Sequence, residues 1–273
     1  MEIGKQAPGT FCWCELGTTN QQAAKKFYAE IFGWKIHEIP ISSDDSYTIL
    51  KIQGKDLGGL YQLGNGQQRQ GVQPHWLSYI AVDSADNCAR AITESGGKLI
   101  MYPFDVLDLG RMTVAQDPTG ATFAIWQPIK YTGAKIRNEK NAMCWNELVT
   151  DDIATAKDFY GKVFGWSAIT EETGSALYTK FYIGDPTGGA VVGGMLQMGG
   201  TLINTLPHWM VHFGVDDCDA FVEKARSLGA TIPTPLIGVP DMGQFAVLRD
   251  QQSAVFSVVS PQCEFANWKQ SHF

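Results

Sequence analysis

The segment FYAEIFGW at residues 27–34 recurs in the same chain as FYGKVFGW at residues 159–166. The residues before it repeat as well, because WCELGTTN at 13–20 returns as WNELVTDD at 145–152, an offset of 145 − 13 = 132. Further on, PHW at 74–76 returns at 207–209. Self-similarity of this length indicates one architecture built twice in tandem. The 273 residues are enough for two domains, each with its own core.

Each half contains the same order of predicted elements. An apolar run from Phe11 predicts a strand, and Asn20 then supplies a helix N-cap. The apolar residues at 24, 27, 28 and 31 fall on one helical face, and Gly33 ends that helix. Three strands follow, and this β-α-β-β-β order then returns three more times. We therefore expect an α+β fold made of four βαβββ modules in two pairs.

The same repeat sets the predicted domain boundaries. They are a first domain over 8–128, a polar linker over 129–141, a second domain over 142–261 and a C-terminal tail over 262–273. The sequence does not decide which modules pair. If the first module pairs with the second, Glu15 meets Tyr79, whereas pairing with the fourth module brings Glu15 to His212.

Charge and cysteine usage exclude several classes of protein. The net charge is −7 and there is no run of Lys or Arg, which argues against nucleic acid and membrane surfaces as partners. No apolar run has membrane-span length and the first residues do not resemble a signal peptide, so we expect a cytoplasmic protein. The six cysteines include no CxxC pair and indicate buried thiols. The oligomeric state stays open, a homodimer included.

Two motifs carry a resemblance to a known family. The helix D-x-x-x-A-x-x-F-Y-x-x-x-F-G-W at 152–166, the closing strand D-P-x-G-A-x-F at 117–123 and the module order resemble the vicinal oxygen chelate superfamily. Its members include glyoxalases, bleomycin-resistance proteins and extradiol dioxygenases, and this chain is most similar to the tandem glyoxalase-like proteins of bacteria. The resemblance implies two half-barrel domains, each with a cavity for a small-molecule ligand.

The resemblance also implies where metal-using members place their ligands. Counting from the helix caps and strands, the first half has Trp13, Leu77 and Ala124 at these positions. The second half has Trp145, Met210 and Ser257 there. None of these side chains is a usual ligand of a divalent cation. We therefore expect a site with no metal and no cofactor.

Strand alternation predicts what lines the cavities instead. With Trp13 at the ligand position, Trp13 and Glu15 point inward, while Cys12, Cys14 and Leu16 face the helix. The predicted first pocket contains Trp13, Glu15, Leu77, Tyr79, Ala124 and Trp126, and the predicted second pocket contains Trp145, Glu147, Met210, His212, Ser257 and Val259.

The candidate catalytic groups are Glu147 and His212, with Glu15 as a third, because an acid beside an imidazole suits proton transfer near neutral pH. The candidate ligand-binding residues are Trp13, Tyr79, Trp126, Trp145, Met210 and Ser257. The alternative is structural: a carboxylate that braces its strand, a core histidine, and tryptophans that fill the core.

Four functions remain open at this point. The first is metal-independent binding of a small molecule between aromatic walls. The second is an enzyme of lyase, isomerase or oxygenase type that uses Glu and His for proton transfer on a carbonyl or hydroxylated compound. The third is a metal-dependent glyoxalase or dioxygenase, and the fourth is an interaction protein whose cavities are vestigial.

Overall fold

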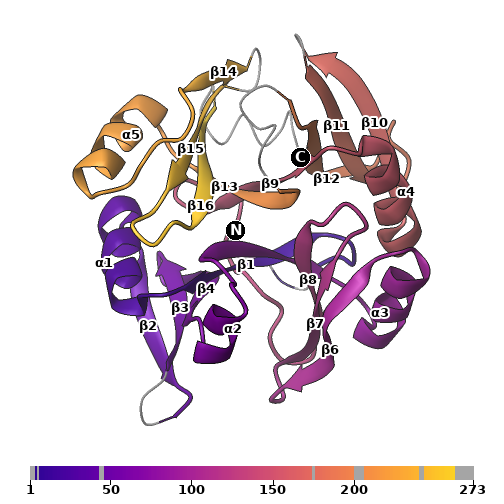
Figure 1. The fold of residues 1–273 in the computed structure, drawn as a ribbon, viewed down its shortest axis with the longest axis horizontal. Coiled ribbons are helices and arrows are strands. Elements are labelled where there is room, and N and C mark those ends of the chain that lie inside the picture. Colours follow the sequence, from indigo (N-terminus) through magenta and orange to yellow (C-terminus); the bar gives the residue numbers. More distant parts are fainter. Residues whose placement is uncertain are drawn as a thin grey trace.

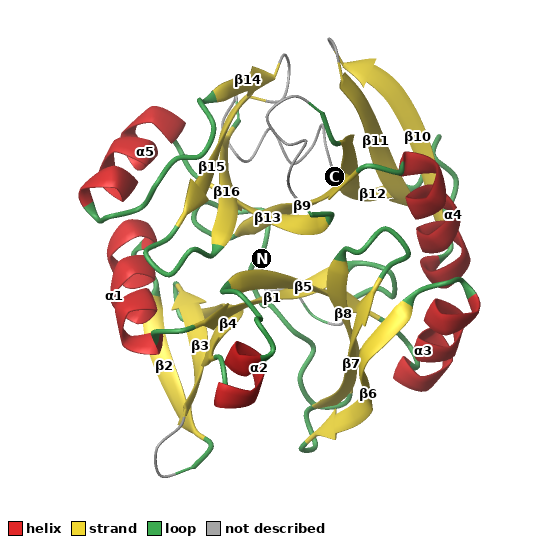
Figure 2. Cartoon of the chain, in the orientation of Figure 1, coloured by secondary structure: helices red, strands yellow, loops and turns green. Residues whose placement is uncertain are grey.

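The computed structural model describes residues 4, 6–42, 46–173, 176–199, 206–239 and 243–261. The predicted C-terminal tail, with Cys263, lies outside these residues. The described chain forms two eight-stranded sheets with the longer helices at their flanks (Figures 1 and 2). Each sheet contains two βαβββ modules, which confirms the predicted α+β fold. No helix among the described residues is both long and apolar enough to span a bilayer.

The first half builds one sheet in the order β2-β3-β4-β1-β5-β8-β7-β6. Its elements are β1 (Phe11–Thr18), α1 (Gln21–Phe32), β2 (Lys35–Pro40), β3 (Ser46–Ile52), β4 (Lys55–Gln62), α2 (Asn65–Arg69), β5 (His75–Ala81), α3 (Ala85–Glu94), β6 (Lys98–Val106), β7 (Gly110–Gln116) and β8 (Thr122–Pro128). The short helix α2 has no counterpart in the predicted module.

The second half builds the other sheet in the matching order β10-β11-β12-β9-β13-β16-β15-β14. Its elements are β9 (Met143–Thr150), α4 (Ile153–Phe164), β10 (Trp166–Thr173), β11 (Ala176–Ile183), β12 (Ala190–Gln197), β13 (His208–Gly214), α5 (Cys218–Ser227), β14 (Ile237–Val239), β15 (Gly243–Arg249) and β16 (Val255–Ser260).

Strand pairing decides which modules share a sheet. β1 pairs antiparallel with β5, with Trp13 opposite Tyr79 and Glu15 opposite Leu77. β9 pairs with β13 in the same way, with Trp145 opposite His212. The first module therefore pairs with the second, and Glu15 lies in one sheet while His212 lies in the other.

The two sheets curve away from each other and pack through their convex faces (Figure 1). One apolar cluster joins the two halves, with α1 beside α5 and α3 beside α4 (Figure 1). At its centre the Ser78 hydroxyl of β5 donates a hydrogen bond to the Asn146 side chain of β9 at 2.7 Å. Trp76, Ile80 and Val82 lie on this convex side, as alternation predicts.

Two tyrosines connect the halves within this core. The Tyr28 hydroxyl of α1 donates to Asp250 Oδ2 at 3.0 Å and accepts from the Trp76 indole at 3.0 Å. Tyr160 of α4 repeats the arrangement with Asp117 and Trp209 at 2.8 and 2.7 Å. Each tyrosine is fully buried, so its hydroxyl satisfies two polar groups that water does not reach.

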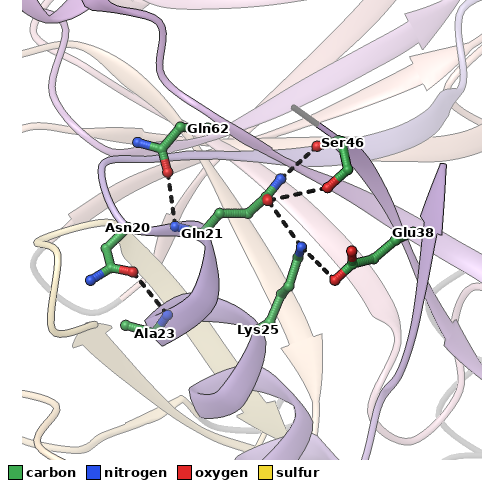
Figure 3. A network of polar contacts seen from close by, with 7 residues as sticks. All are labelled: Asn20, Gln21, Ala23, Lys25, Glu38, Ser46 and Gln62. Atoms are coloured by element: carbon green, nitrogen blue, oxygen red, sulfur yellow. Dashed lines mark hydrogen bonds and ion pairs between the residues drawn. The ribbon is translucent and has the colours of Figure 1, made fainter. Parts of the chain in front are cut away.

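The start of α1 shows how the repeated motif fixes a helix. Asn20 accepts a hydrogen bond from the Ala23 amide, and Gly33 ends the helix in the left-handed conformation with φ of 75°. The buried Lys25 donates to Gln21 at 2.9 Å and to Glu38 of β2 at 2.8 Å (Figure 3). Gln21 donates in turn to the Ser46 carbonyl of β3 (Figure 3). This network holds α1 against two strands of its sheet.

One predicted orientation is wrong. Cys12 lies with Trp13 on the concave side and not beneath the helix, while Phe11 takes its place in the core. The cause is an irregularity in the β1–β5 register between Phe11 and Trp13, which interrupts the alternation. Cys14 and Leu16 follow the prediction. The five described cysteines are buried free thiols, as expected.

Replacing Tyr28 or Tyr160 by Phe should lower the free energy of unfolding by about 1–3 kcal/mol, because each change leaves a buried indole N–H without its acceptor. Chemical denaturation monitored by tryptophan fluorescence measures the effect. Tyr102→Phe is the control, since that side chain is 81% exposed and should change stability by less than about 0.5 kcal/mol. Equal effects for all three variants would contradict the role of these hydroxyls.

Candidate functional site

The concave face of the first sheet carries a cluster of buried side chains. Trp13, Leu77 and Ala124 lie on the neighbouring strands β1, β5 and β8. They belong to a cluster of buried residues that comprises Cys12, Trp13, Ile49, Leu77, Tyr79, Ala81, Ala124, Trp126 and Ala134. The Trp126 indole donates to the Tyr131 carbonyl at 2.8 Å, so this tryptophan is fixed from within.

Glu15 is held by two tyrosines on this face. The Tyr47 hydroxyl donates to Oε1 at 2.5 Å and the Tyr79 hydroxyl donates to Oε2 at 2.7 Å. The Trp13 indole donates to the Tyr47 oxygen at 3.2 Å. Burial raises the pKa of Glu15, and the two tyrosine hydrogen bonds oppose that rise. Each carboxyl oxygen therefore has a donor, which is the arrangement of a structural brace.

The concave face of the second sheet repeats this plan, with fewer hydrogen bonds to the carboxyl among the described residues. The Trp145 indole donates to the Tyr178 hydroxyl at 3.0 Å, as Trp13 does to Tyr47. The Tyr178 hydroxyl also lies near Glu147 and lowers the pKa of that carboxyl. Met210 is opposite Glu147 in the strand register and is buried. Ser257 is buried too, and its hydroxyl donates to the Ala246 carbonyl at 3.0 Å.

His212 occupies the position that Tyr79 has in the first sheet. Tyr79 is opposite Trp13, and His212 is opposite Trp145. His212 Nε2 lies 4.0 Å from Glu147 Oε1, which is too long for a hydrogen bond. This nitrogen is buried and has no hydrogen-bond partner among the described residues. The second carboxyl thus lacks the donor that Tyr79 gives to the first.

Burial shifts both ionisable groups toward their neutral forms. It raises the pKa of Glu147 to about 7, and the hydrogen bond from Tyr178 opposes part of that rise. It lowers the pKa of His212 to about 3. The imidazole is therefore uncharged near pH 7, and its contact with Glu147 is not an ion pair. Glu147 is the group on this face that can gain or lose a proton near neutrality.

Sequence reasoning missed Tyr47 and Tyr178. They lie on β3 and β11, far along the chain from the carboxyls that they bind. The repeat itself contains a signal, because the dipeptide Tyr-Thr occurs at 47–48 and again at 178–179. Both tyrosines need a neighbouring glycine, since a Cβ at Gly59 or Gly194 would lie 2.0 Å from the tyrosine oxygen.

The side chains at the family's metal positions do not fit a divalent cation. They are an indole, an isobutyl and a methyl group in the first sheet. In the second they are an indole, a thioether and a hydroxyl that is bonded to a backbone carbonyl. Within the part of the chain that the structure describes, no three His, Cys, Asp or Glu side chains come together in a way that could hold an ion.

Sequence comparisons agree with the fold. A family model described as the Glyoxalase/Bleomycin resistance protein/Dioxygenase superfamily matches residues 10–125 and 141–253. CFP32 from Mycobacterium tuberculosis, provisionally named a glyoxylase, is 36% identical over 255 residues, covering 93% of this chain and 95% of CFP32. The anthracycline biosynthesis protein DnrV from Streptomyces peucetius is 35% identical over 263 residues, covering 93% of this chain and 94% of DnrV.

Solved structures share the fold at low sequence identity. The Mn(II)-bound glyoxalase from Novosphingobium aromaticivorans has a TM-score of 0.62 and 14% identity, covering 95% of this chain and 85% of its own. The 2,2',3-trihydroxybiphenyl 1,2-dioxygenase from Sphingomonas wittichii has a TM-score of 0.62 and 10% identity, and the match covers 93% of this chain and 91% of the dioxygenase chain. These similarities show the fold alone.

The pKa of Glu147 makes stability depend on pH in a defined direction. The folded-state pKa of about 7 lies above the ordinary value of 4.5, so the folded protein binds the proton more tightly than the unfolded chain. Its stabilising contribution is complete below pH 4.5 and is lost as pH rises through about 7. Relative to Glu147→Gln, the wild-type protein should lose about 3 kcal/mol of unfolding free energy between pH 5 and 8.

Chemical denaturation at several pH values measures this difference. Both proteins contain His212, so the comparison between them cancels the opposite effect of His212 on the unfolding free energy. Glu94→Gln, which changes an exposed carboxyl on α3, is the control and should follow the wild-type pH profile. Parallel profiles for the wild type and Glu147→Gln would show that Glu147 ionises normally.

Proposed function

The chain belongs to the glyoxalase/bleomycin resistance protein/dioxygenase superfamily, and on that premise we propose that the concave face of its second sheet binds a small organic molecule without a metal ion. The motifs in the α4 helix and the β8 strand indicated this family correctly. The family hosts several chemistries on one fold, so the function is argued from the side chains on that face.

The difference between Glu15 and Glu147 carries the proposal. The first carboxyl has two tyrosine donors and lies among closely packed apolar side chains. The second has the Tyr178 hydroxyl nearby and faces a buried imidazole nitrogen that has no hydrogen-bond partner among the described residues. A buried polar group without a partner costs about 1–3 kcal/mol, so a ligand that supplies the missing hydrogen bond at His212 would gain binding free energy there.

An aromatic or other flat apolar ligand suits this face. Trp145 and Met210 provide an indole and a thioether beside the carboxyl, and both are side chains that pack well against aromatic rings. DnrV, a relative across nearly the whole chain, is named for the biosynthesis of anthracyclines, which are polycyclic aromatic compounds. The donor chemistry at the family's metal positions supports binding without a metal.

Catalysis is the second candidate, and one observation favours it. A carboxyl with a pKa of about 7 can take or give a proton at neutral pH, which is the requirement for a general acid or base. Glu147 would then move a proton on a carbonyl or hydroxylated compound, with the neutral His212 beside it. Turnover that Glu147→Gln abolishes, at ligand concentrations that still saturate the variant, would establish the enzyme over the binding protein.

Calorimetric titration with 2-naphthol and 2-acetonaphthone tests the binding proposal. We expect one molecule bound per chain, and Glu147→Gln should weaken binding about tenfold or more, equivalent to the loss of about one hydrogen bond to a polar group. Glu15→Gln is the matched control in the other sheet and should change the affinity less than about twofold. Two equal sites per chain, or a loss of binding caused by Glu15→Gln, would contradict the assignment to the second sheet.

A further inference from the structure

We infer that the ligand of the second sheet presents a neutral hydroxyl group, of phenol or enol type, whose oxygen lies between Glu147 Oε1 and His212 Nε2. This inference rests on the proposed function and adds the chemical class of the ligand. It starts from three observations on the same face: the spacing of the two atoms, their burial and the absence of a partner for Nε2 among the described residues.

The spacing suits a bridging oxygen. Oε1 and Nε2 are 4.0 Å apart, too far to bond each other directly. A single oxygen can lie about 2.8 Å from both atoms, at the apex of a triangle with them. The side chains of Glu147 and His212 are only 14% and 8% exposed, so an oxygen that bridges them is sheltered from water and its hydrogen bonds count strongly.

A hydroxyl group fits this position better than other oxygen groups. With Glu147 protonated, the hydroxyl accepts from the carboxyl and donates to Nε2. With Glu147 ionised, it donates to the carboxylate and accepts from Nε2–H in the other tautomer. A carbonyl oxygen only accepts, so it satisfies both partners in neither of these states. A hydroxyl satisfies both partners in each state.

Anionic ligands are disfavoured on the same face. Among the described residues, no Lys or Arg contributes a charge interaction to Glu147 or His212. A carboxylate would have to lie beside Glu147 without a compensating cation, and burying such a charge is costly. The ligand class is therefore a neutral aromatic alcohol and not an aromatic acid.

His212 is the residue that sets this specificity. In the first sheet the same position holds Tyr79, whose hydroxyl reaches Glu15 at 2.7 Å and leaves no gap to bridge. Exchange of tyrosine for histidine shortens the reach of the side chain and leaves 4.0 Å between the partners. The ligand hydroxyl thus takes the place that the Tyr79 hydroxyl has in the first sheet.

Calorimetric titrations with 2-naphthol, naphthalene and 2-naphthoate test the inference. In the wild-type protein, 2-naphthol should bind about tenfold or more tightly than naphthalene, and 2-naphthoate should bind more weakly than 2-naphthol. In His212→Phe the preference of 2-naphthol over naphthalene should fall below about threefold. In His212→Tyr, which recreates the Tyr79 arrangement, 2-naphthol should lose most of its affinity.

The outcomes separate the inference from the proposed function. Equal affinities for 2-naphthol and naphthalene would overturn the hydroxyl inference while leaving the binding site in place. Failure of all three probes to bind would overturn the proposed function as well. A wild-type measurement keeps the test independent of the variants: 2-naphthol should shift the 15N resonance of His212 Nε2, and an unchanged resonance in the bound state would refute the bridge.

Discussion

The shared apolar core between the two convex faces is the constraint from which the rest of the structure follows. Because strands alternate, each residue buried between the sheets places its neighbours on a concave face. Trp209, Val211 and Phe213 of β13 lie in the core, which directs Met210 and His212 to the other side. The side chains available for binding or catalysis are thus those at the alternate strand positions, which face away from the core.

The two concave faces have matching residues at most positions but give their glutamates different surroundings. Both contain a tryptophan, a glutamate two residues on, and a tyrosine whose hydroxyl accepts from the indole. In the first sheet that tyrosine also donates to the carboxyl. In the first sheet a second tyrosine completes the hydrogen bonds of the carboxyl. In the second sheet a histidine lies at the matching position, 4.0 Å from the carboxyl, and burial raises the pKa of Glu147 to about 7. A single exchange between repeats distinguishes a braced carboxyl from one that can titrate near neutrality.

Much of this arrangement could be predicted from the sequence. The repeat and the alternation of β1, β5, β9 and β13 placed Glu15, Tyr79, Glu147 and His212 on concave faces, because most positions on the other side of those strands are apolar. The prediction was wrong at Cys12, because the alternation of residue types along the sequence does not reveal the register irregularity between Phe11 and Trp13. Tyr47 and Tyr178 were missed because contacts between strands distant in sequence depend on register.

The titration of Glu147 tests the account most directly. In protein labelled with 13C at the glutamate side-chain carboxyls, the resonance that Glu147→Gln removes should titrate with a midpoint of about 7. In His212→Tyr, where a second hydroxyl reaches the carboxyl, the midpoint should move to lower pH. A midpoint for Glu147 near the ordinary value of 4.5 would contradict the central claim that its missing donor leaves this carboxyl available to a ligand.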